Sequence, residues 1–144
     1  MTDLNIAKQE FIEGDWSLVI VKDGCVLQRL KEHRLVPLLR ALHAVEANAQ
    51  GCSVADKVIG RAAAMLLISY GARAIYTPLM SEEAKRLLET ASIDVIAEEL
   101  VPHILDNTGQ DLCPMEKLVA DIQQPTLGLK RLLQFFHDKG IPVE

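Results

Sequence analysis

Aromatic residues, basic charge and long apolar runs are all scarce in this chain of 144 residues. Phe, Trp and Tyr make up 4% of the chain, so Leu, Ile, Val and Ala must build its core. Lys and Arg number 15 against 20 Asp and Glu, and the net charge of −5 is opposite to what a nucleic-acid surface needs. The longest apolar stretch, 62–72, is too short to cross a bilayer. We therefore expect neither a nucleic acid nor a membrane as partner.

Cysteine is also scarce, and Cys25, Cys52 and Cys113 form no Cys-x-x-Cys pair. An odd number of widely spaced cysteines is typical of free thiols in a reducing compartment. The first residues, MTDLNIAKQEF, lack the apolar core and the basic leader of an export signal. These features predict a cytoplasmic protein, and the length suits a single domain over residues 1–144.

The apolar pattern predicts alternating helices and strands. Asp23-Gly24, between two β-rich runs, predicts a tight N-terminal β-hairpin. The stretch Ser53–Tyr70 predicts a helix, because Ser53 and Asp56 form an S-x-x-D capping pattern and Gly71 follows as a stop. Residues 62–68 are apolar on every side, so this helix must be enclosed. Further helices are expected over 3–13, 36–48, 81–91, 113–122 and 126–140, and strands over 72–79 and 93–100.

The strand over 72–79, the helix after it and the strand over 93–100 are joined by short links. A strand, helix and strand in this order imply a right-handed parallel crossover. Together with the hairpin, this predicts a three-layer α/β sandwich with a mixed sheet.

Four strings carry a family resemblance: LVIVKDG, GCSVADKVIGRAAAMLLI, MSEEA and LVPHILDNTGQDLCPMEKLV, in that order. They resemble a small prokaryotic family of unknown function, and the match runs over roughly residues 2–124. That family is similar in fold to cytidine deaminases but lacks their zinc site. The resemblance therefore implies a cytidine-deaminase-like fold and assigns no reaction.

A zinc-dependent deaminase needs His-x-Glu or Cys-x-Glu where its central helix begins and Pro-Cys-x-x-Cys where the next helix begins. The corresponding strings here are Val54-Ala55-Asp56 and Pro78-Leu79-Met80-Ser81-Glu82. Val and Leu cannot bind a metal, so zinc-dependent deamination is excluded, and we expect no metal and no cofactor. A metal held by Cys52, His103 and Cys113 stays open, without support from local ligand spacing.

Polar residues open the predicted helix at Ser53. Lys57 and Arg61 are four positions apart and would share one face near the positive end of the helix dipole. Two cations there are reasonable if an anion lies in front of them, where Ser53 and the free backbone amides would help to bind a phosphate. Asp56 would then accept hydrogen bonds from a ribose or a base. Alternatively, Ser53 and Asp56 are only a capping box, and the two cations pair with acids or point to water.

A second candidate group lies in the string DLCPMEK. Pro114 is suited to the first helical position, which makes Cys113 the cap residue, where the dipole lowers the pKa of a thiol. Glu116, Asp56 or His103 would act as the base of a nucleophilic thiol. Alternatively, Cys113 is a small buried residue and Glu116 a capping acid.

The leading hypothesis is therefore a nucleotide- or nucleoside-binding protein whose ligand carries a phosphate, with Thr108 and Gly109 closing over it. The first alternative is a metal-independent transferase or hydrolase that uses Cys113 with Asp56 or Glu116. The second is a ligand-free structural or regulatory homo-oligomer. Its apolar contact would come from the C-terminal helix, through Leu129, Leu132, Leu133, Phe135 and Phe136.

Overall fold

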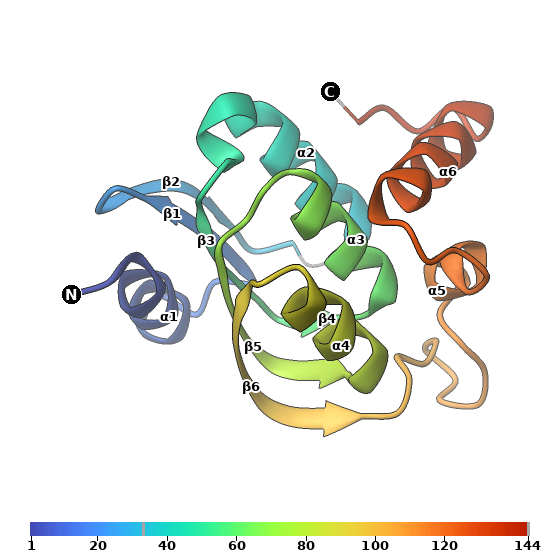
Figure 1. Cartoon of the computed structure of the whole chain (residues 1–144), viewed down its shortest axis with the longest axis horizontal. Coiled ribbons are helices and arrows are strands. Elements are labelled where there is room, and N and C mark those ends of the chain that lie inside the picture. Colours follow the sequence, from blue (N-terminus) through green and yellow to red (C-terminus); the bar gives the residue numbers. More distant parts are fainter. Residues whose placement is uncertain (33, 144) are drawn as a thin grey trace.

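The computed structural model describes residues 1–32 and 34–143, which form a six-stranded mixed sheet with helices around it (Figure 1). No helix among these residues is both long and apolar enough to pass through a membrane. In chain order the elements are α1 (Asp3–Glu13), β1 (Leu18–Lys22), β2 (Cys25–Leu30), α2 (Leu35–Val45), η1 (Glu46–Ala49), β3 (Ser53–Asp56), β4 (Val58–Ile59), α3 (Arg61–Ser69), β5 (Ala74–Ser81), α4 (Glu82–Thr90), β6 (Asp94–Val101), α5 (Pro114–Val119) and α6 (Pro125–Asp138).

The sheet combines antiparallel and parallel pairs. β1 lies between β2 and β3 and is antiparallel to both, whereas β3, β4 and β6 are parallel to β5. β1 and β2 meet across Asp23 and Gly24, whose positive φ values of 52° and 79° suit a tight turn. The parallel pairing of β5 and β6 around α4 agrees with the predicted crossover.

β3 and β4 are two parts of one interrupted strand that runs parallel to β5. Both pairings join residues 21 positions apart, 53 with 74 and 58 with 79. The interruption lies opposite Pro78, which has no N–H to donate to a ladder. Thr77 hydrogen-bonds through its Oγ1 with both Leu79 O at 3.0 Å and Leu79 N at 3.3 Å, and so bridges the same gap within β5.

The apolar core of the described residues lies on both faces of the sheet. On one face, Phe11 of α1 packs with Val19, Ala55 and Tyr76. On the other face, buried residues of α2, α3 and α4 pack against β1, β3 and β5, and α5 and α6 lie outside α3 (Figure 1). Helices therefore cover the sheet on two sides, with α3, whose residues 61–67 are all buried, at the centre of the larger layer.

The predicted helix over Ser53–Tyr70 is wrong in its first half, because residues 53–56 and 58–59 are strands and α3 begins only at Arg61. All four residues of β3 are buried, between β1 and β5. A short run of buried residues suits either structure, and a local S-x-x-D pattern does not decide between them. Consequently Ser53 and Asp56 form no capping box, and Lys57 and Arg61 do not share a helix face.

The C-terminal part of the chain contains one isolated bridge and a helix that begins one residue early. The segment between β6 and α5 contains a single isolated bridge, between Leu105 and Leu112. α6 begins at Pro125, one residue before the predicted helix over 126–140, and the side chain of its N-cap residue Gln124 makes no capping hydrogen bond.

Candidate functional site

A pocket of about 670 Å³ lies where β3 and β4 end and α2, α3 and α5 begin. In open α/β sheets, ligands bind at the carboxyl ends of strands, so its position suits a binding site. Its walls come from four parts of the chain: Arg34, Leu35 and Leu38; Asp56, Val58, Gly60, Ala62 and Ala63; Ile104, Leu105, Asp106, Asn107 and Thr108; and Cys113, Pro114, Met115 and Glu116.

Asp56 is the last residue of β3, and its side chain is only 6% exposed. Within the described chain, the N–H of Lys57 is the one donor to its carboxyl, at 2.8 Å from Oδ1. Burial raises the pKa of Asp56 from 3.8 to about 7, and the single backbone hydrogen bond opposes that rise. Near neutral pH this carboxyl is therefore divided between its protonated and ionised forms, and it can exchange a proton with a ligand.

Glu116, in the first turn of α5, is also buried but has its hydrogen bonds made. Its Oε1 accepts from Arg61 N at 2.6 Å, and its Oε2 accepts from Ala62 N at 2.8 Å. It thus caps α3, a helix 55 residues away in sequence, where the dipole favours a negative charge. Burial raises the pKa of the Glu116 carboxyl, and the two amides and the Arg61 charge oppose the rise.

Gly60 makes room for this cap. A Cβ at this position would lie 2.7 Å from Cδ of Glu116 and 2.9 Å from Cγ1 of Ile104. Both distances are shorter than van der Waals contact, so a side chain at position 60 would displace the Glu116 carboxyl or the loop that carries Ile104.

The loop between β6 and α5 forms the outer wall of the pocket. It is a small hairpin in which Cys113 N donates to Ile104 O at 3.0 Å and Asp106 N donates to Asp111 O at 2.8 Å. Thr108 lies at its tip and donates its hydroxyl to Asp106 Oδ1 at 2.5 Å. Cys113, at the end of this hairpin, is partly buried and lines the pocket together with Asp56.

The structure thus brings together four of the residues singled out in the sequence, and four others lie outside the pocket lining. Asp56, Thr108, Cys113 and Glu116 line it. Outside it are Ser53, which is buried within β3; Lys57, which is exposed after β3; Gly109, which is exposed beyond the hairpin tip; and Arg61.

Arg61 is buried, and its guanidinium is bound by the protein itself. It donates to Val119 O from Nε at 3.0 Å and to Ile122 O from Nη2. Nη1 pairs with Glu83 at 3.1 Å, and Glu83 also pairs with His103 at 3.0 Å. Arg61 therefore ties α5 and α4 to α3, which is a structural task rather than the predicted phosphate contact.

Arg34 also lines the pocket, although no sequence pattern indicates it. It is exposed, precedes α2, and is the one Lys or Arg among the described residues that line the pocket. A single arginine between a strand and a helix has no local signal, because only the fold brings it near β3. Leu35 and Leu38 follow it on the same wall.

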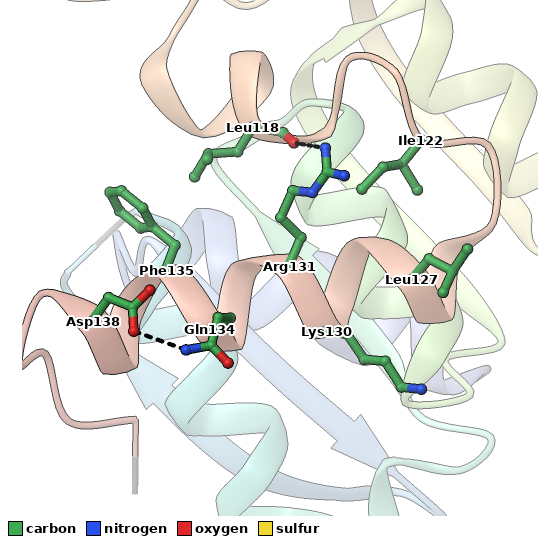
Figure 2. Close-up of a pocket in the computed structure, with 8 residues that line it drawn as sticks. All are labelled: Leu118, Ile122, Leu127, Lys130, Arg131, Gln134, Phe135 and Asp138. Atoms are coloured by element: carbon green, nitrogen blue, oxygen red, sulfur yellow. Dashed lines mark hydrogen bonds between the residues drawn. The ribbon is translucent and has the colours of Figure 1, made fainter.

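A second hollow of about 610 Å³ lies between α5 and α6 (Figure 2). Its polar groups bind one another: Arg131 donates to Leu118 O at 3.1 Å, and Gln134 donates to Asp138 at 2.8 Å. The buried α6 residues Leu132 and Phe136 belong to the core against α3. The apolar face of α6 proposed as an oligomer contact is thus largely used within the chain.

No three His, Cys, Asp or Glu side chains in the described ranges gather as a metal-binding group. Cys52 is buried in the core, whereas His103 pairs with Glu83 at the surface. The string 54–56 that was compared with a zinc motif lies on a strand, and the central helix begins with Gly60-Arg61-Ala62, which offers no metal ligand.

The fold and pocket define an α/β protein with a ligand-sized site at the carboxyl end of a central strand. The chain belongs to the family described as TM1506, domain of unknown function DUF1893, whose model matches residues 6–136. It is similar to the crystal structure of a DUF1893 family protein (TM1506) from Thermotoga maritima, with 25% identity and a TM-score of 0.84. That likeness covers 94% of this chain and 92% of the other. No curated protein matches the chain.

Proposed function

We propose that the protein binds a nucleoside or nucleotide in the pocket at the end of β3. The observation that carries the proposal is the buried Asp56 carboxyl, which opens into a pocket of about 670 Å³ with one backbone donor. A pocket of this size suits a nucleoside, and apolar walls with a few directed polar groups are typical of small-molecule sites. A base would place its hydrogen-bonding edge against Asp56.

The other parts of such a ligand meet different walls. The faces of a base would contact apolar side chains such as Leu38, Ala62 and Met115. A ribose would lie toward the hairpin tip at Asn107 and Thr108. A phosphate would be met by Arg34 at the exposed edge, since Lys57 lies outside the lining and Arg61 is held by Glu83 and backbone carbonyls.

A zinc-less cytidine-deaminase-like scaffold remains part of this proposal. In support, the enclosed helix α3 is followed by β5 and then α4, which is the layout in which a nucleoside deaminase holds its metal. Neither helix start carries the zinc ligands, so the same layout would serve binding through side chains such as Asp56.

Calorimetric titration with the four common ribonucleosides and their 5′-monophosphates tests the proposal. We expect at least one nucleoside to bind and Asp56→Asn to weaken it about tenfold or more, because a hydrogen bond to a charged group is lost. Asp94→Asn, an exposed change on β6, is the matched control and should leave affinity unchanged. Absence of binding by all eight compounds at millimolar concentration would refute the proposal.

A second candidate is a metal-independent acyl transferase or hydrolase, favoured because Cys113 and Asp56 line one pocket. Asp56 would take the thiol proton as Cys113 Sγ attacks an acyl carbon, and would return it to the leaving group. Glu116 is unsuited as the base, because both its oxygens accept backbone amides.

Iodoacetamide labelling tests this second candidate. It is best done in a Cys25→Ser background, because Cys25 is exposed and would react as well. We expect Cys113 to label below pH 8 in the folded protein and more slowly after Asp56→Asn. Labelling of Cys113 only after unfolding would rule the thiol out as a nucleophile.

A further inference from the structure

Three of the polar side chains around the pocket, those of Asp106, Thr108 and Glu116, are already engaged within the protein. Glu116 uses both carboxylate oxygens on α3. Asp106 accepts the hydroxyl of Thr108 at 2.5 Å and the N–H of Thr108 at 3.0 Å. The Thr108 hydroxyl in turn accepts from Gln110 N at 3.2 Å. These three groups hold the walls in place, and their own hydrogen-bonding capacity is largely used.

Asp56 is the exception among the buried groups of this pocket. Its Oδ1 accepts one backbone N–H, and its Oδ2 has no hydrogen-bond partner within residues 1–32 and 34–143. In that part of the chain, Ser69 Oγ is the one side-chain polar atom that is both fully enclosed and without a partner. Oδ2 of Asp56 also lacks a partner, so it is not fully enclosed. The free oxygen therefore opens to the pocket.

No cation of the described chain forms an ion pair with Asp56, and the walls beside it are largely apolar. The other titratable groups of the pocket are Arg34, Asp106, Cys113 and Glu116. On the sheet, β1 places Leu18 opposite Asp56, and β5 places Thr77 in line with it, so neither strand offers a charge. An ionised carboxylate in these surroundings is stabilised most by donors from a ligand.

We infer that the pocket selects bases that present two adjacent N–H donors, as guanine does with N1–H and its 2-amino group, and that these donors bind the ionised Asp56 carboxylate. The inference rests on the proposed function and names the class of base. Cytosine and adenine present one amino donor beside a ring-nitrogen acceptor, and uracil presents one N–H between two carbonyls. Each places an acceptor against the carboxylate, which repels it.

Ionisation of Asp56 on binding has a measurable consequence. In the free protein the carboxyl has a pKa of about 7, so it carries a proton at lower pH. Donors to the carboxylate lower that pKa in the complex, and the proton leaves for the solvent. We therefore expect proton release on guanosine binding at pH 6 and markedly less release at pH 8.

Guanosine and inosine are the matched probes, because inosine keeps N1–H and lacks only the 2-amino group. Titrating each by calorimetry, in two buffers of different ionisation enthalpy, gives affinity and proton release together. We expect guanosine to bind about tenfold or more tightly than inosine, because one charge-assisted hydrogen bond is lost. In Asp56→Asn, one acceptor becomes an amide donor, so the guanosine to inosine ratio should fall toward one and the proton release should vanish.

Circular dichroism and thermal melting of Asp56→Asn test whether the variant is folded, and Asp94→Asn is the control for a lost surface charge. Three outcomes would overturn the donor-pair inference: equal binding of inosine, tighter binding of cytidine, adenosine or uridine, or proton uptake at pH 8. None of these outcomes would contradict nucleoside binding itself. Failure of every nucleoside to bind would overturn the proposed function and this inference with it.

Discussion

The end of β3 and the start of α5 each place one buried carboxyl in the same pocket, and the two carboxyls are treated differently. Asp56 is 6% exposed and Glu116 is 8% exposed. Glu116 receives two amides, a helix dipole and the charge of Arg61, whereas Asp56 receives one backbone N–H. The two carboxyls are about equally buried, but Glu116 receives more groups that stabilise its negative charge than Asp56 does.

This difference shows which acid holds the fold together and which is left for a ligand. A buried charge is tolerated when donors stabilise it, and otherwise it holds a proton or awaits a partner. Glu116 joins α5 to α3, so the wall of the pocket depends on it. Asp56 joins nothing beyond its own neighbour, and its substitution should change binding more than architecture.

The largest effect on stability is expected from Glu116→Ala. The change leaves two amides of α3 without their charged acceptor, and we expect a loss of about 3 kcal/mol in the free energy of unfolding. Urea unfolding measures it, and Glu89→Ala on the exposed side of α4 is the control. A loss below about 1 kcal/mol would show that the cap contributes little to the fold.

Asp56→Asn should have the next largest effect, with a sign that depends on pH. A carboxyl whose pKa is raised from 3.8 to about 7 holds its proton more tightly in the folded state, so stability falls as pH rises between those values. The variant lacks that fall. Relative to the wild type, we expect it to gain roughly 2 to 3 kcal/mol between pH 5 and pH 8, measured by urea unfolding. A difference independent of pH would mean that Asp56 ionises normally.

Gly60→Ala sharpens the comparison from the side of Glu116. The backbone φ of −103° suits alanine, so the loss arises from the new Cβ pushing on Glu116 and Ile104. We expect about 2 kcal/mol of destabilisation by urea unfolding. In the Glu116→Ala background the same change should cause a smaller loss, and full additivity would show that the two residues do not interact.

Arg34→Ala should have the smallest effect on the fold, within about 0.5 kcal/mol, because the side chain is exposed. If Arg34 meets the phosphate, affinity for a nucleoside monophosphate should fall by about two- to fivefold, and affinity for the nucleoside should not change. Lys57→Ala is the matched control for a lost cation outside the pocket. A greater loss with Lys57→Ala than with Arg34→Ala would place the phosphate elsewhere.

The sequence predicted those elements whose signals are local. Asp23-Gly24 marks the turn between β1 and β2, and Ser81 caps α4 by accepting Ala84 N at 3.1 Å. The helix over Ser53–Tyr70 was wrong because a buried strand followed at once by a buried helix reads as one continuous apolar pattern. The polar residues within it were therefore assigned to a helix end that does not exist.

The sequence predicted several residues of the candidate site correctly, but it predicted what each residue does less well. Asp56, Cys113 and Glu116 carry chemistry that is visible from residue type, and the fold places them around one pocket. Two roles depend on tertiary contacts: Glu116 caps a distant helix, and Arg61 binds the backbone carbonyls of Val119, at the end of α5, and of Ile122, just after it. No sequence pattern indicates Arg34, because only the fold places it beside the pocket.

Pro78 does not line the pocket, yet it influences the shape of the strand end that does. By interrupting the ladder opposite residues 56 and 57, it divides the strand at the point where Asp56 enters the pocket. Anyone who grafts this pocket onto another scaffold must therefore carry Pro78 along with Asp56 and Gly60. A transplanted site would thus need a proline on the strand next to the one that carries Asp56.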